Sequence, residues 1–295
     1  MYEKYFEKLK EECLIRNRSS RTSEAYISNI KTFMKWTGNK SMKELTLQDA
    51  REFILFKRNS GIAAATCNLY NSSICFLYKH VLHIPWDQDV VPRMKLDTKL
   101  PSALSLEEVE TLIDTATHIR NKAIIALLYS SGLRAGELTR LKASDIYASR
   151  MQVYIPESKN HRDRWTILSN RALELLTEYW RSYPVKRDHF FVSTKYPYLP
   201  LTVNGVESMF RSVARDAGIN AHLHTLRHSF ASHMIENGVS INYVQAMLGH
   251  RCLESTQVYI HISNKTIMGI KSPLDHPQKK KRGRKPKKKD GETNE

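Results

Sequence analysis

Four short segments of the sequence carry residues whose types and spacing could act on a phosphate group. In chain order they are 131–137 (SGLRAGE), the polar stretch around Lys159, 224–228 (HTLRH) and 248–259 (LGHRCLESTQVY). An arginine fixed on a packed helix can offer parallel N–H donors to a phosphate, and a nearby histidine can carry a proton. Together these segments indicate chemistry on a phosphate ester.

The third segment places its basic residues on one helix face. His224 and Arg227 are three residues apart and His224 and His228 are four apart, so they are neighbours on a helix surface. Arg134 lies where an apolar helix ends and turns, so a second guanidinium group could converge on the same place. Glu137, three residues further on, could orient it.

Each segment also has an ordinary structural explanation. Arg134 and Glu137 could form a surface ion pair, which contributes little to stability. His224 could be a core histidine, Lys159 part of an ordinary turn, and Tyr259 a core residue. The occurrence of all four segments in one chain favours the functional interpretation.

The elements that must position these residues are mostly helical. Apolar residues recur at helical spacing through the first 82 residues, which predicts four helices, and prolines then interrupt 83–101, which predicts a linker. The segment from Thr46 to Asp49 is typical of a capped helix start in the first domain. Ser105 and Glu108 form a capping box that begins a second helical domain. Its predicted elements are a β-hairpin of 151–155 with 165–168, which carries Lys159 in its tip, and helices at 170–182, 203–217, 224–237 and 241–248.

The charge balance points to a polyanionic partner. The 295 residues include 46 Lys or Arg and 30 Asp or Glu, a net charge of +16. The segment 272–295 accounts for only +5 of this, so the body of the protein is itself basic. This positive charge favours nucleic acid over a membrane surface as the partner. Separately, the longest apolar run is far too short to cross a bilayer.

Cysteine usage indicates the compartment. The four cysteines form no CxxC pair, which is typical of reduced thiols in a cytosolic protein and not of a disulfide framework or a zinc site. The charged N-terminal segment does not read as a secretory signal. We therefore expect a cytoplasmic, nucleoid-associated protein.

The basic C-terminal segment, 272–295, has almost no apolar residue and is expected to be disordered alone. Within it Arg282, Gly283, Arg284 and Lys285 precede a proline and resemble an AT-hook, which inserts into a narrow A·T minor groove. Nonspecific phosphate affinity is the first interpretation of these DNA-binding residues, A·T preference the second and a nuclear address the third.

The order and spelling of the four segments resemble the tyrosine recombinase (phage integrase) family, in particular its compact Xer-like branch. His-x-Leu-Arg-His, Leu-Gly-His and Thr-x-x-Tyr in one chain are specific together. The resemblance implies a mainly α fold with a small antiparallel β element, arranged as a two-domain DNA clamp. Residues 1–98 would be a SAM-like core-binding domain with its linker, and 99–271 the catalytic domain.

The resemblance also implies a set of catalytic residues and no cofactor or metal. The set is Arg134, Lys159, His224, Arg227, His250 and Tyr259. The two arginines would neutralise the phosphate and Tyr259 would attack it, leaving a 3′-phosphotyrosyl link and a 5′-hydroxyl. His224 would accept the Tyr259 proton, Lys159 would protonate the departing oxygen, and His250 would bind the phosphate or orient the nucleophile.

One departure from the family pattern concerns the hairpin tip. Ser158 and Asn160 flank Lys159 in place of the usual glycines, and His161, Arg162 and Arg164 lie nearby.

The partners implied by the resemblance are double-stranded DNA and further copies of the chain. A homotetramer would act on two recombination sites, with a monomer or dimer off DNA. Residues 262–271 could pack on a neighbouring subunit, or within their own chain. The basic C-terminal segment favours an enzyme of a mobile element.

Three other functions remain open at this point. One is a type IB topoisomerase-like nicking–closing enzyme with the same chemistry but no strand exchange. Another is a noncatalytic DNA-binding regulator on the same scaffold. A third is a metalloenzyme, suggested by the histidines between 222 and 261, although no acidic ligand follows His224 at a fitting position.

Overall fold

The computed structural model describes residues 2–96, 103–156, 163–183, 187–193, 196, 199–250, 254–257 and 259. The chain folds into two units, Met1–Lys99 and Leu100–Glu295. The predicted fold class is confirmed, because the described elements are helices apart from one small antiparallel sheet. No helix among the described residues is long and apolar enough to cross a membrane.

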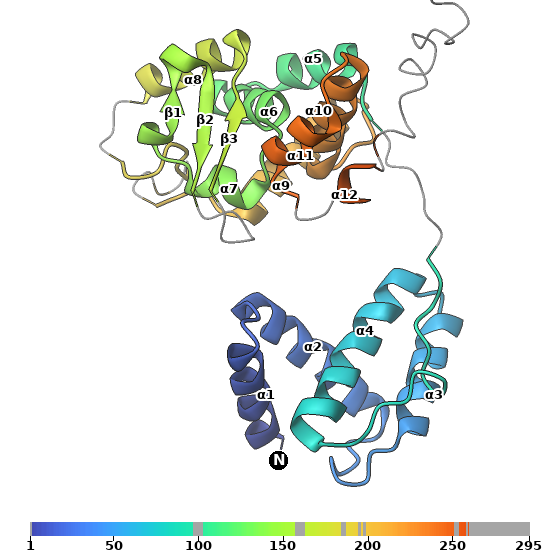
Figure 1. Cartoon of the computed structure of the whole chain (residues 1–295). Coiled ribbons are helices and arrows are strands. Elements are labelled where there is room, and N and C mark those ends of the chain that lie inside the picture. Colours follow the sequence, from blue (N-terminus) through green and yellow to red (C-terminus); the bar gives the residue numbers. More distant parts are fainter. Residues whose placement is uncertain are drawn as a thin grey trace, which may run out of the picture. The chain divides into compact units, whose positions relative to one another are not determined.

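The first unit is a helical bundle (Figure 1). Its elements are α1 (Glu3–Ile15), α2 (Ser20–Trp36), α3 (Leu47–Asn59), α4 (Ala64–Phe76) and a π-helical turn, Leu77–Leu82. Four predicted helices are thus confirmed, and Thr46 and Asp49 form the predicted capping box of α3. Their apolar faces enclose a core that includes the fully buried Phe33, Phe53 and Tyr78.

The first part of the stretch predicted as a linker packs on this unit instead. Val91 is buried, and Trp86 and Met94 contact the same core. The side chain of Asn68 accepts a hydrogen bond from the Met94 amide (2.9 Å) and donates one to its carbonyl oxygen (2.9 Å). Such anchoring by side chain–backbone bonds leaves no periodic pattern, so the sequence did not reveal it.

The second unit contains helices on one side of a three-stranded sheet. Its elements are α5 (Leu106–Thr115), α6 (Ile119–Ser131), α7 (Ala135–Arg140), β1 (Ile146–Tyr147), β2 (Gln152–Ile155), β3 (Arg164–Ile167), α8 (Asn170–Ser182), α9 (Val203–Asp216), α10 (Leu223–Glu236), α11 (Ile241–Leu248) and α12 (Glu254–Gln257), with short 3₁₀ turns at Ala143–Asp145 and Ala148–Arg150. The predicted hairpin is confirmed, since Ile155 pairs with Arg164 and Gln152 with Ile167. The sequence did not predict β1, which is only two residues long.

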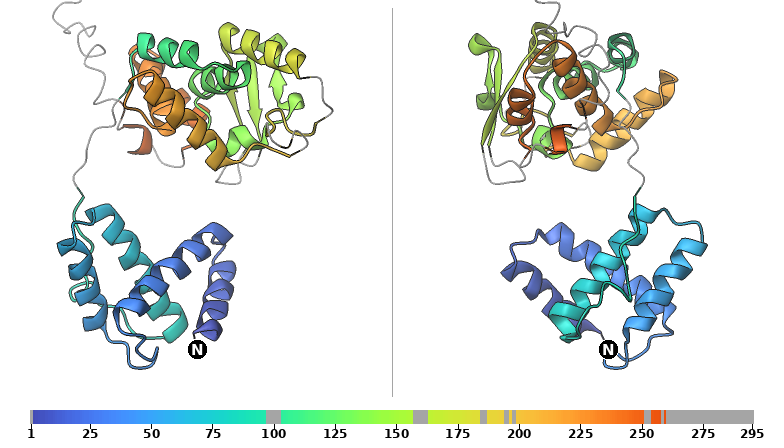
Figure 2. Two further views of the ribbon diagram at one scale, coloured as in Figure 1. Left: turned by 180° about the vertical axis from the view of Figure 1, so that it is seen from behind. Right: turned by 45° about the vertical axis from the view of Figure 1, so that its right-hand side comes forward.

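The arrangement of this unit brings distant segments together. In the views of Figures 1 and 2 the strands lie at one side of the unit and α5 and α10 at the other. Helix α6 is apolar around its whole circumference, with Ala123 to Leu128 buried, and it packs against α5, α8 and α10. Helix α11 lies against β3, so the hairpin and the C-terminal helices meet.

Helix α6 ends at a glycine that no other residue could replace without strain. Gly132 has a φ of +60°, a left-handed conformation that disfavours a side chain. A Cβ built there would lie 2.5 Å from Cδ1 of Phe230 on α10. The close approach of α6 and α10 therefore depends on the missing side chain.

We predict that Gly132→Ala destabilises the second unit by roughly 2–5 kcal/mol, from backbone strain and overpacking together. Gly218→Ala is the matched control, because Gly218 has a similar φ of +68° but nothing lies within 4 Å of its added Cβ. That variant should lose only about 1–2 kcal/mol. Urea unfolding of both proteins measures the difference, and equal losses would contradict the packing argument.

Candidate active site

The Arg227 side chain extends from α10 into the interior of the unit, where it donates hydrogen bonds to carbonyl groups at the C-terminal ends of two other helices. Its Nη1 donates to the carbonyl oxygen of Gly132 at the end of α6 (2.6 Å), and its Nη2 donates to that of Leu248 at the end of α11 (2.6 Å). Helix C-termini carry partial negative charge and unpaired carbonyl groups, so a cation is stabilised there. These bonds fix the guanidinium group firmly.

The charge of Arg227 survives this burial. Burial lowers the pKa of its guanidinium group to about 9, and the neighbouring charge of Arg134 acts in the same direction. Arg227 therefore remains a cation at neutral pH. The described contacts leave two of its five N–H donors without a protein partner, which suits an incoming anion.

Arg134 begins α7 and is held by Glu137, as the spacing suggested. Its Nη1 donates to Oε1 of Glu137 (3.0 Å), and its backbone N–H donates to Oε2 (2.8 Å). The Arg134 side chain is 24% exposed, whereas that of Glu137 is 2% exposed. The Arg134 guanidinium group is thus partly exposed to solvent, while the Glu137 carboxylate that holds it is buried.

The same carboxylate binds a second arginine that the sequence had not marked as important. Arg164, the first residue of β3, donates from Nη1 to Oε1 of Glu137 (2.8 Å) and from Nη2 to Oε2 (2.7 Å). Burial acts to raise the pKa of Glu137, but the hydrogen bonds and charge of Arg164, followed by those of Arg134, outweigh it and hold the pKa at about 2. Glu137 is therefore ionised throughout the physiological range.

His250 follows α11 and joins Arg227 to α12. Its Nε2 lies 3.1 Å from Nη2 of Arg227, and its Nδ1 lies 2.9 Å from Oγ1 of Thr256. Burial and then the charges of Arg227 and Arg134 lower its pKa to about 4. The neutral ring accepts from Arg227 through Nε2, which leaves the proton on Nδ1 to donate to Thr256.

Tyr259 is buried at 3% exposure, and its hydroxyl group meets His228 (Nδ1 to Oη, 2.8 Å). Burial raises the pKa of Tyr259, and the charges of Arg227 and Arg134 oppose this. Burial, followed by the charges of His224 and Arg227, lowers the pKa of His228. The tyrosine is therefore protonated and the histidine neutral at pH 7, so the phenol donates to Nδ1.

The structure thus brings four of the six predicted residues together, namely Arg134, Arg227, His250 and Tyr259. His224 lies on the same helix as Arg227 with an exposed side chain, and among the described residues it makes no contact with the Tyr259 hydroxyl. Lys159 falls outside the described residues, as do the predicted DNA-binding residues Arg282, Gly283, Arg284 and Lys285.

Two members of this network were not predicted. Arg164 had been noted only as one of several basic residues near the hairpin tip, and its clue was the alternation that turns it inward in β3. His228 shares a helix face with His224, so the spacing alone could not tell which of the two meets Tyr259.

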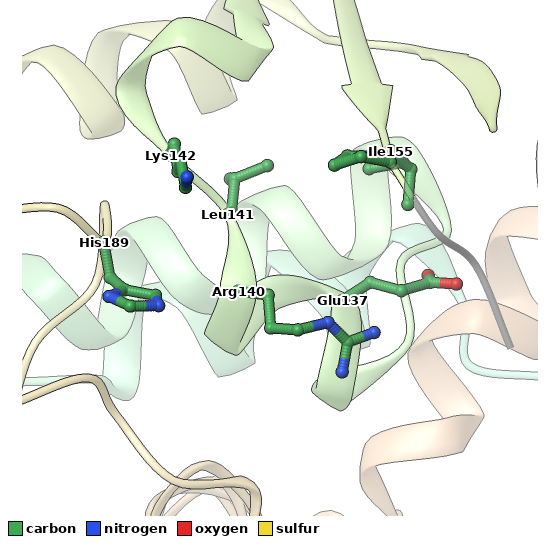
Figure 3. A pocket seen from close by; sticks show the side chains of 7 residues that line it. Glu137, Arg140, Leu141, Lys142, Ile155 and His189 are labelled. Carbon is green, nitrogen blue, oxygen red and sulfur yellow. The ribbon is translucent and has the colours of Figure 1, made fainter.

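A cavity of about 270 Å³ lies beside α7 and carries further basic residues (Figure 3). Arg140, Lys142 and His189 line it, with Glu137 and Ile155 at its wall. In Figure 3 the Glu137 carboxylate points away from Lys142 and His189. The positive charge of this region therefore extends beyond the arginines that bind Glu137.

The described residues contain no group of three His, Cys, Asp or Glu side chains that could hold a metal ion. Two of the three histidines of α10 bind other partners instead: His228 contacts the hydroxyl group of Tyr259, and His233 contacts that of Tyr129 (2.8 Å). The geometry gives the metalloenzyme interpretation no support within this part of the chain.

Comparison with known families identifies the family of the chain. Residues 102–266 match the phage integrase family, and residues 5–88 match the phage integrase N-terminal SAM-like domain. The first match covers more than half of the sequence, so the chain belongs to the phage integrase family. It is a tyrosine recombinase, a site-specific enzyme that breaks and rejoins DNA strands through a 3′-phosphotyrosyl intermediate, as the sequence resemblance implied.

Individual relatives support the same assignment. The chain is 30% identical over 273 residues to tyrosine recombinase XerC of Bacillus pumilus, which covers 85% of this chain and 89% of that protein. The crystal structure of XerA recombinase is 25% identical, with a TM-score of 0.53, and covers 90% of this chain and 96% of that one. A lambda integrase tetramer bound to a Holliday junction shares the fold, with 19% identity, a TM-score of 0.71 and coverage of 87% and 76%.

We predict that the second unit loses stability as the pH falls from 6.5 toward 4.5. The folded pKa of His250, about 4, lies below its ordinary 6.5, so the unfolded chain binds more protons in this window and acid favours unfolding. With a discount for its partial exposure, the contribution of His250 is about 2 kcal/mol. Denaturant unfolding at both pH values measures the slope.

His250→Gln is the control for this prediction, because the amide cannot take up a proton in this range. Its stability should fall less steeply than that of the wild type over the same window. Parallel slopes for the two proteins would show that His250 is not the group responsible.

Proposed function

We propose that Arg134, Lys159, His224, Arg227, His250 and Tyr259 form the catalytic site of this recombinase, with His228 added to the set. The observation that carries the proposal is that the Tyr259 hydroxyl group lies 2.8 Å from Nδ1 of His228, the residue that follows Arg227 on α10. The charges of Arg227 and Arg134 reach the same hydroxyl group. Two cations and a phenol within electrostatic range of one another are what a phosphoryl-transfer site requires.

The two arginines would stabilise the transition state. A phosphodiester carries one negative charge on its nonbridging oxygens, and attack by the phenol raises this toward two. Arg134 and Arg227 are fixed before DNA arrives, so they need no reorganisation as that charge develops. The energy of the broken ester is kept in the phosphotyrosyl ester, so the reverse attack by a 5′-hydroxyl needs no external energy source.

The proton of Tyr259 has a nearby acceptor in His228. The 2.8 Å contact to Nδ1 is within reach for general base catalysis, and the lowered pKa keeps the ring neutral and able to accept. We therefore assign this step to His228 in place of His224. His224, exposed on the same helix, would then contact the phosphate.

Lys159 would protonate the departing 5′-oxygen, which is a poor leaving group as an alkoxide. The support for this role is the antiparallel pairing of β2 with β3, in which Ile155 lies opposite Arg164 and Lys159 falls between the two strands in the sequence. His250 would release its contact with Arg227 as the phosphate takes up those donors.

The DNA partner would be a duplex held between the two domains, which we take as residues 1–98 with the linker and 99–271. Arg140 and Lys142 add exposed positive charge near the site, suited to flanking phosphates. We infer a homotetramer on two recombination sites, as in the lambda integrase complex with a Holliday junction, and a monomer or dimer off DNA. A cytoplasmic, nucleoid-associated location would follow, and the segment 272–295 would add nonspecific DNA affinity.

We predict that the protein becomes covalently attached to a nicked substrate from which the 5′-hydroxyl fragment can diffuse away. The adduct should map to Tyr259 and form in the presence of EDTA. Tyr259→Phe should abolish it and still bind DNA, because only the nucleophilic oxygen is removed. Tyr243→Phe is the matched control, since Tyr243 is 70% exposed, and it should react like the wild type. An adduct mapped to another residue would overturn the assignment.

We predict that His228→Asn slows single-turnover cleavage about 100-fold and removes the acidic limb of the pH–rate profile. In the wild type the rate should fall as the pH drops through the lowered pKa of His228, below 6.5, because the protonated ring cannot accept a proton. His224→Asn should retain that limb. If the limb instead disappears only in the His224 variant, His224 is the acceptor.

A further inference from the structure

The Arg164 side chain is buried, and its hydrogen bonds connect segments that carry residues of the proposed site. The side chain is 6% exposed. Both terminal nitrogens are engaged with the two oxygens of Glu137 in a bidentate pair, and its Nε donates to the carbonyl oxygen of Met247 (2.7 Å). Nε and both terminal nitrogens of Arg164 therefore each donate to a protein acceptor, and the side chain is almost fully buried.

The bonds of Arg164 join three of the segments that carry catalytic residues. Arg164 itself begins β3, where it pairs with Ile155 of β2. Glu137 lies on α7, where it also holds Arg134. Met247 lies on α11, and the next carbonyl oxygen, that of Leu248, accepts from Arg227. One buried side chain therefore connects the anchors of both arginines expected to bind the phosphate.

The chain makes room for this contact at Gly249. A Cβ there would lie 3.0 Å from Cδ of Arg164, and the φ of +65° disfavours a side chain in any case. Because Gly249 has no side chain, the Arg164 side chain can lie against the backbone between Leu248 and His250. The close packing indicates that the position of the guanidinium group is closely constrained.

We propose that Arg164 is a positioning residue for catalysis: through Glu137 it keeps Arg134 directed at the scissile phosphate, and through Met247 it ties the hairpin to the end of α11. The inference rests on the roles proposed above for Arg134 and Tyr259. Glu137 needs two cations for its two oxygens. Without Arg164, Arg134 is the remaining guanidinium partner of the buried Glu137 carboxylate. More of the Arg134 N–H donors would then bind Glu137, and fewer would be available to the phosphate.

Arg164→Met and Arg164→Lys test this on the nicked substrate under single-turnover conditions. Methionine removes the charge, and lysine keeps it but cannot form the bidentate pair. We expect Arg164→Met to cleave about 100-fold more slowly, with DNA affinity changed less than about threefold. Arg171→Met is the matched control, because Arg171 forms only exposed ion pairs with Glu110 and Asp114, and it should cleave like the wild type.

A second substrate separates positioning from a general loss of structure. A methylphosphonate at the scissile position carries no negative charge, so a misplaced Arg134 matters less there. The defect of Arg164→Met should shrink from about 100-fold to less than about tenfold on this substrate. An equal defect on both substrates would mean that Arg164 has a structural role alone, and would overturn the inference.

The remaining outcomes are also decisive. If Arg164→Met fails to fold, the ratio of defects on the two substrates is measured with Arg164→Lys, and failure of both variants to fold would overturn the positioning role. Full cleavage activity in Arg164→Met, with the adduct on Tyr259, would refute the inference and leave the proposed function intact. A wild-type protein that forms no adduct on Tyr259 would instead refute the proposed function.

Discussion

The rest of the site depends on the interaction of the Glu137 carboxylate with Arg134 and Arg164. This carboxylate is almost fully buried and accepts from two guanidinium groups and a backbone amide, while a third guanidinium, that of Arg227, lies within electrostatic range. Among the described residues of the site, three arginines therefore share one acid, which leaves two positive charges in excess. A bound phosphodiester balances one of them, and the second is balanced only as the transition state gains charge. The site is in this sense more complementary to the transition state than to the substrate.

Several side-chain hydrogen bonds that join elements of the second unit also fix the arginines of the proposed site. Arg227 closes the C-terminal ends of α6 and α11, and Arg164 joins β3 to α7 and α11. A catalytic group fixed by such bonds loses little entropy when substrate binds. The glycines at 132 and 249 serve this arrangement. Gly132 allows Phe230 of α10 to approach the backbone that Arg227 contacts, and Gly249 allows the Arg164 side chain to approach the end of α11. Stability and catalysis are coupled through a few shared atoms.

Sequence patterns predicted the elements well wherever the signal was local. The capping boxes at Thr46 and Ser105 and the bounds of α8 and α11 follow from propensity, periodicity and glycine termination. The four chemical segments were likewise visible, and Arg134, Arg227, His250 and Tyr259 do meet. What the sequence could not supply were partners chosen by tertiary packing. Arg164 bonds to Glu137, 27 residues away in the sequence, and His228 bonds to Tyr259, 31 residues away. Contacts between such distant residues produce no repeating pattern in the sequence.

The seclusion of Tyr259 has a consequence for how the free enzyme behaves among other molecules. Its phenol sits beside Phe230 and Leu248 in an apolar cluster, still protonated and shielded from water. Nitrating or acylating reagents would modify exposed tyrosines such as Tyr243 well before they reached it. Burial therefore protects the proposed nucleophile from reagents that modify the exposed tyrosines.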